Sequence, residues 1–140
     1  MLVKTYASAV HGVDARTITV EVNAGGQVHA GTKNFYHLVG LPDVAVKEGF
    51  QRIEAAIKNI GFKMMRLKMV VNLAPADIRK EGSAYDLPIA LGVLGSTKQM
   101  QGDKLSKYTI MGELALDGEL RSIKGALPIA IQARKEKFQG

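Results

Sequence analysis

The sequence predicts one α+β domain in which helices pack on a mixed sheet. Two kinds of hydrophobic pattern support this prediction, because some segments alternate with a period of two and others follow helical spacing. The length of 140 residues is close to the commonest size of a single domain. Apolar residues make up 46% of the chain and charged residues 23%, which is an ordinary mixture for a domain with a buried core.

The first elements expected are two strands joined as a hairpin. Residues 17–22 alternate apolar and polar side chains, which indicates a strand with one buried face. Residues 2–10 are its expected partner, with a turn at 11–14. A loop at 23–26, which contains two adjacent glycines, is expected to end the second strand.

A third strand, over residues 36–41, is expected to lead into an amphipathic helix. Asp43 is a good N-cap residue, because its carboxylate can accept a hydrogen bond from a backbone N–H of the first turn. Apolar residues then recur at spacings of three and four up to Ile60. Gly61 is the expected C-terminal stop of this helix.

The period of two returns over residues 64–72, which predicts a fourth strand. A polar loop at 75–82 is expected to lead to a second helix over about 84–95. Pro88 must either lie in the first turn of this helix or kink it, because a proline deeper inside would cost about 3 kcal/mol.

The C-terminal part is expected to contain a hairpin and a helix. Residues 109–116 have the pattern of a strand, and the Asp-Gly pair at 117–118 is a strong signal for a tight turn into residues 119–121. A third helix is expected to begin near Pro128.

The composition excludes several kinds of chemistry. The chain has no Cys, which excludes disulfides, thiolate metal sites and a Cys nucleophile. None of its three His residues lies three or four positions from another, so no metal site is expected. Residues 92–98 have the letters of a phosphate-binding loop in the wrong order, so no nucleotide cofactor is expected here. Without an apolar stretch of membrane-spanning length or a signal peptide, the expected location is cytoplasmic.

The net charge of +6 permits a polyanionic partner. The excess is uneven, because residues 61–82 carry five basic and two acidic side chains. A solvated strand face and loop would explain this charge equally simply.

One region carries a family signature. Residues 72–90, Asn-Leu-Ala-Pro-Ala-Asp-Ile-Arg-Lys-Glu-Gly-Ser-Ala-Tyr-Asp-Leu-Pro-Ile-Ala, closely resemble the N-terminal domain of the magnesium-chelatase-like AAA+ ATPases related to ComM and YifB. Segments 9–15, 39–48 and 112–118 resemble the same family in the same order. The resemblance therefore covers nearly the whole chain.

The resemblance implies a fold and a parent protein. The fold would be that of ribosomal protein S5 domain 2, shared by the Lon-protease-like domains, over residues 1–140 as one domain. An AAA+ ATPase module, which binds ATP and Mg²⁺, would follow beyond residue 140. Family members are implied to be homo-hexameric ATPases that remodel DNA during recombination and transformation (competence), so DNA, the protein's own ATPase module and further copies are the expected partners, and a membrane is not.

Lon-type peptidases use a Ser–Lys dyad, and the resemblance allows its two positions to be located. Ala84 stands at the Ser position and Leu127 at the Lys position, so this part of the protein is expected to be non-catalytic. Two alternatives stay open, a residual peptidase that uses Ser83 and Lys124, and a magnesium-chelatase-type subunit. The structural interpretation of Ser83 is a helix N-cap, and that of Lys124 is a solvated turn charge.

The remaining role for the domain is contact with DNA or organisation of subunits. DNA contact requires Lys and Arg side chains on one exposed face. The residues predicted to form such a patch are Arg66, Lys68, Arg79, Lys80, Arg121 and Lys124. Asp77, Glu81 and Asp86 are interpreted as loop and capping charges rather than as an acid pair.

Overall fold

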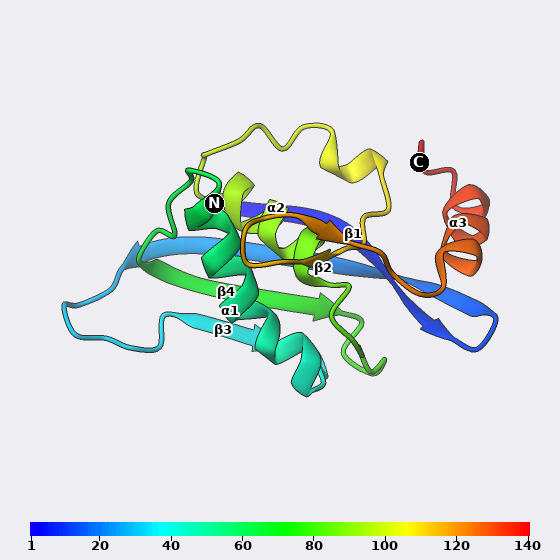
Figure 1. The fold of residues 1–140 in the computed structure, drawn as a ribbon, viewed down its shortest axis with the longest axis horizontal. Helices are drawn as coiled ribbons and strands as arrows, with labels where there is room; N and C mark the ends of the chain where they lie inside the picture. The colour runs from blue at the N-terminus through cyan, green and yellow to red at the C-terminus, as the bar shows by residue number, and fades with distance from the viewer.

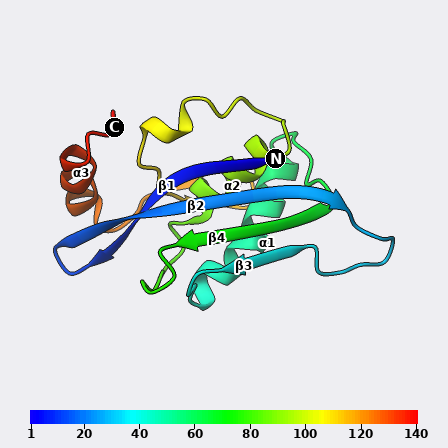
Figure 2. The ribbon, with the colours of Figure 1, turned by 180° about the vertical axis from the view of Figure 1, so that it is seen from behind.

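A four-stranded sheet with two helices on one face forms the centre of the protein (Figure 1). The computed structural model describes all residues from 1 to 140. The sheet strands are β1 (Leu2–His11), β2 (Asp14–Gln27), β3 (Tyr36–Val39) and β4 (Leu67–Ala74). Their order is β1-β2-β4-β3, with β3 and β4 parallel and the other pairs antiparallel. Helices α1 and α2 lie behind the sheet when it is viewed from the back (Figure 2), which confirms the mixed α+β class.

Strands β1 and β2 form the predicted hairpin, but β2 is longer than expected. Its residues Ile18, Val20 and Val22 are fully buried, as the alternation predicts. The prediction of a loop at 23–26 is wrong, because β2 continues to Gln27 and still pairs with β4 at that residue. The two glycines instead occupy a shift in the pairing register, where a residue without a side chain is tolerated.

Helix α1 (Val44–Asn59) connects the parallel strands β3 and β4. Both of its predicted ends are confirmed. The Asp43 carboxylate accepts a hydrogen bond from the Val46 N–H at 2.9 Å, and Gly61 follows the helix with φ +95°. Strand β3 ends earlier than predicted because Gly40 and Leu41 both have positive φ.

Helix α2 (Asp86–Ser96) packs in the centre of the core. Nearly all of its faces are buried, against β1, β2 and α1. Pro88 lies in its first turn, as predicted. A Cβ atom at Gly92 would lie 2.5 Å from a methyl carbon of Val22, so glycine allows the helix to approach the sheet closely.

The C-terminal third differs most from expectation. Its elements are the 3₁₀ turn η1 (Leu105–Lys107), β5 (Glu113–Leu114), β6 (Leu120–Arg121) and α3 (Ala126–Lys135). Only two residues of the strand predicted at 109–116 are in a strand, because Gly112 exchanges backbone hydrogen bonds with Ala84 and Leu87 at the start of α2. The hairpin is present, with a loop at 115–119. None of the helices has the length and apolar character needed to cross a bilayer.

Candidate functional site

The loop from β4 to α2 borders a cleft of about 270 Å³, which is lined by Ala84, at the Ser position of the Lon-type dyad in the family resemblance, but not by Leu127 at the Lys position. Three segments form its wall, namely residues 81–84, Glu113 at the start of β5 and residues 122–124 before α3. The cleft is therefore built by parts of the chain that are far apart in the sequence.

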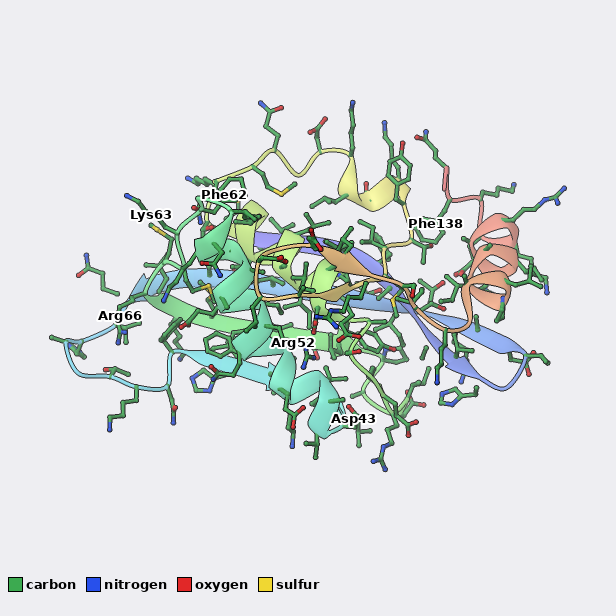
Figure 3. All side chains as sticks on the ribbon, viewed as in Figure 1. Asp43, Arg52, Phe62, Lys63, Arg66 and Phe138 are labelled. Atoms are coloured by element: carbon green, nitrogen blue, oxygen red, sulfur yellow. The ribbon has the colours of Figure 1, made fainter.

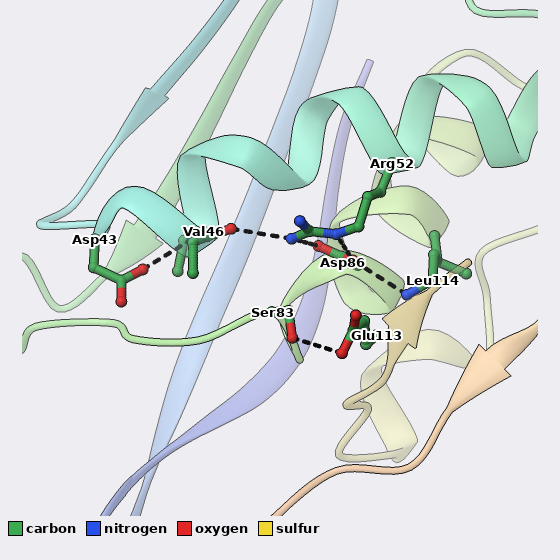
Figure 4. A network of polar contacts seen from close by, with 8 residues as sticks. Asp43, Val46, Arg52, Ser83, Asp86, Glu113 and Leu114 are labelled. Carbon is green, nitrogen blue, oxygen red and sulfur yellow. Dashed lines mark hydrogen bonds and ion pairs between the residues drawn. The ribbon is translucent and has the colours of Figure 1, made fainter. Parts of the chain in front are cut away.

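Ser83 is held across this cleft by a carboxylate. Its Oγ atom donates a hydrogen bond to Oε2 of Glu113 at 2.8 Å (Figure 4). The N-cap interpretation of Ser83 is wrong, since α2 begins at Asp86 and its N-cap residue, Tyr85, makes no side-chain capping bond. Glu113 was not identified from the sequence, because only the tertiary fold brings β5 beside residue 83.

The two positions of the dyad do not form a reactive pair. Ala84 lines the cleft and has no hydroxyl group, while Leu127 is 71% exposed in the first turn of α3. Ser83 and Lys124 line the same cleft, but no hydrogen bond joins them. A lysine acts as a base in such a dyad when it is desolvated, whereas Lys124 is exposed.

Lys80 is a buried structural residue and not part of an exposed patch, which corrects the sequence-based prediction. Its side chain is fully buried, and Nζ donates hydrogen bonds to the carbonyl oxygens of Gly40, at 2.6 Å, and Pro75. Burial lowers the pKa of Lys80, and the nearby Asp77 carboxylate opposes this shift. The ammonium group thus joins the loop after β3 to the loop after β4.

The other five predicted patch residues are exposed but lie in two separate groups. Arg66 and Lys68 lie at the start of β4. Arg79 and Lys124 line a second cleft beyond the other end of this strand. Arg121 lies on β6, three residues before Lys124 in the sequence. The structure therefore does not gather the predicted cations on one face.

The three carboxylates interpreted as loop and capping charges do not form an acid pair. Glu81 makes an exposed ion pair with Arg79 at 3.2 Å. Asp77 is exposed, whereas Asp86 is buried in the first turn of α2.

A buried ion pair fixes α1 against α2 beside the cleft. Arg52 donates to both carboxylate oxygens of Asp86, through Nε at 2.6 Å and Nη2 at 3.0 Å, and Nη2 also donates to the Ala45 carbonyl (Figure 4). The backbone N–H of Leu114 donates to the same Asp86 carboxylate at 3.1 Å. Burial raises the pKa of Asp86, and the hydrogen bonds from Arg52 and Leu114 oppose this shift. The pair therefore holds α1, α2 and β5 in one arrangement.

Comparison with known families places the chain in the magnesium-chelatase class. The sequence model of the family described as "Subunit ChlI of Mg-chelatase" matches residues 18–140, and the chain belongs to this family.

Within this family the chain is related to YifB and ComM, as the sequence predicted. It is 43% identical over 130 residues to "Uncharacterized protein YifB" of Escherichia coli (strain K12), an alignment that covers 93% of this chain and 25% of that protein. It is 40% identical over 132 residues to "Competence protein ComM" of Haemophilus influenzae, covering 94% of this chain and 25% of that protein. The chain thus spans about a quarter of the length of these relatives.

Proposed function

We propose that this chain is a non-catalytic domain of a ComM-like AAA+ ATPase, in which it contacts DNA or organises the subunits of a hexamer. The observation that carries this proposal is the cleft without a reactive dyad. Ala84 and Leu127 occupy the two dyad positions, and the neighbouring Ser83 hydroxyl donates to a carboxylate. A domain without a reactive dyad would act by binding DNA or by holding subunits together.

The parent protein in this proposal uses ATP to remodel DNA during recombination and DNA uptake in the cytoplasm. Its support is the similarity to ComM, of which the chain covers about a quarter. ATP and Mg²⁺ would be bound by a module outside these 140 residues. We also propose the fold of ribosomal protein S5 domain 2, supported by the one-sided helix layer and the parallel β3–α1–β4 connection.

DNA contact is tested by mobility shift of the 140-residue chain with duplex, forked and single-stranded DNA at about 50 mM salt. We expect retardation of at least one DNA that weakens steeply with added salt, because neutralised phosphates release counterions. If none of the three DNAs is retarded, DNA contact is refuted, and the subunit role is then judged by whether deleting this domain from the full-length protein changes its oligomeric state.

A residual peptidase is the second candidate, because Ser83 and Lys124 share one cleft of about 270 Å³. We expect no casein fragments from the wild-type chain, since the Ser83 hydroxyl already donates to Glu113 and Lys124 is exposed. The matched variants are Ser83→Ala and Lys124→Gln. Fragments from the wild type that disappear in both variants would establish the peptidase instead.

A further inference from the structure

One end of the sheet is built from two segments without any carboxylate side chain. Residues 22–42 contain Lys33 and no Asp or Glu, and residues 55–76 contain four cations and again no Asp or Glu. These segments lie side by side, because β4 pairs with the end of β2 on one edge and with β3 on the other. Their positive charges are therefore not neutralised by neighbours within this part of the sheet.

Four of these cations form what we call the basic end. All four are exposed and none takes part in an ion pair. Lys58 is left out because it pairs with Glu54 at 3.3 Å. Figure 3 shows Lys63 and Arg66 at the same end of the molecule, close to the loop between β2 and β3. The members of the basic end are Lys33, Lys63, Arg66 and Lys68.

Two side chains of the basic end also make defined contacts with their neighbours. The Arg66 guanidinium lies 5.3 Å from the centre of the Phe35 ring, and its Nη2 atom donates to the Thr32 carbonyl at 2.5 Å. Lys68 lines a cavity of about 220 Å³ together with His29 and His37. No carboxylate lines this cavity, so its polar groups suit an anion.

At the opposite end of the sheet, the cations that the sequence placed in the patch lie close to carboxylates. There Arg79 is paired with Glu81, and Arg121 stands directly across from Glu113 in the β5–β6 hairpin. The cleft beside Lys124 is lined by the same two glutamates. Carboxylates therefore accompany each exposed cation that the sequence placed in the patch at this end.

We propose that the basic end binds the sugar–phosphate backbone of DNA, an inference that rests on the proposed DNA contact and locates it. The cations come from the β2–β3 loop, the α1–β4 loop and β4, and neighbouring strands are about 4.8 Å apart. Cations spread over three segments can each meet a different phosphate of one DNA backbone, whereas a single small anion would contact fewer of them. Each phosphate neutralised releases counterions, which makes the binding favourable and dependent on salt.

The test compares two fourfold Lys/Arg→Gln variants of the 140-residue chain by titrating a labelled DNA duplex at several salt concentrations. Both variants lower the formal net charge from +6 by the same four units. The first changes the basic end, and the matched control changes exposed lysines elsewhere. The control positions are Lys104, Lys107, Lys135 and Lys137.

We expect the basic-end variant to bind at least about tenfold more weakly at 50 mM salt and to lose about 3.6 units of the slope of log K against log salt, from four phosphate contacts at about 0.9 units each. The control should bind within about threefold of wild type. A second variant that keeps Arg66 and changes only the three lysines should lose most of the same affinity, which guards against a disturbed Phe35 contact.

Three results would overturn the inference. Equal weakening of both variants would mean that overall charge, rather than this surface, attracts DNA. An unchanged affinity of the basic-end variant, with wild type still bound, would place the DNA elsewhere on the domain while leaving the proposed function intact. Failure of the wild type to bind DNA would contradict both the proposed DNA contact and its location, and retention on phosphatidylserine vesicles would then indicate a lipid surface as the anionic partner.

Discussion

Replacing Lys80 with methionine is expected to lower the free energy of unfolding by about 3 kcal/mol, which is a large part of the stability of a small domain. Methionine fills similar space but donates no hydrogen bonds. The carbonyl oxygen of Gly40 would then lose its charged donor, and that of Pro75 would keep only a long hydrogen bond from the Ile78 N–H at 3.4 Å. A buried acceptor without a partner costs about 1–3 kcal/mol. The measurement is urea unfolding at pH 7, followed by circular dichroism.

Arg79 supplies the matched control, because it is the neighbouring cation and lies on the surface. Its ion pair with Glu81 joins side chains that are 67% and 61% exposed. Exposed pairs of this kind contribute about 0–1 kcal/mol, so Arg79→Met should unfold close to wild type. If Lys80→Met is as stable as Arg79→Met, the assigned role of Lys80 in joining the two loops is wrong.

Local patterns in the sequence predicted the elements whose determinants are also local. The Asp43 cap and the Gly61 stop depend on residues within one helical turn, and both were placed correctly. The buried face of β2 follows from simple alternation. The strand predicted at 109–116 failed because its backbone groups bond to the start of α2, a partner that no local pattern contains.

The candidate site was less predictable because its contacts join distant parts of the chain. Lys80 lies in a polar loop, where a lysine is ordinarily exposed, and its burial depends on a carbonyl that is 40 residues away. The bond from Ser83 to Glu113 spans 30 residues. The expected vacancy of the dyad, in contrast, rests on the family resemblance, which places Ala84 and Leu127 at its two positions, and neither side chain carries a reactive group.

The segment from Lys80 to Asp86 makes several contacts that hold this domain together. Lys80 joins two loops, Tyr85 is buried with its hydroxyl donating to the Ser8 carbonyl at 3.0 Å, and Asp86 joins α1, α2 and β5. The exposed cations of the basic end lie at the other end of β4. A structural role near the cleft and a binding role at the basic end can thus be tested by separate substitutions.

The second large effect on stability is expected when the Arg52–Asp86 pair is broken. The pH dependence of the free energy of unfolding then shows whether the charge of Asp86 is the cause. Arg52→Met should cost about 3 kcal/mol at pH 7, because it leaves a buried carboxylate without its cation. The pKa of Asp86 is already raised by burial and should rise further in the variant. Between the ordinary aspartate pKa and this raised value the folded state holds a proton that the unfolded state releases, so stability rises as the pH falls.

Unfolding of Arg52→Met in urea should therefore show a clear recovery of stability from pH 7 to pH 5, steeper than in wild type. The double variant Arg52→Met/Asp86→Leu removes both charges and should recover most of the loss at pH 7, leaving the cost of the unpaired Leu114 N–H. Leucine at 86 would place an apolar side chain against α1, in the space that the Asp86 carboxylate now fills. This space is limited, because a Cβ at Gly49 would lie 2.6 Å from Oδ1 of Asp86. A loss in Arg52→Met that is equal at both pH values, and that the double variant does not reduce, would show that Arg52 stabilises the fold by packing alone and not through the charge of Asp86.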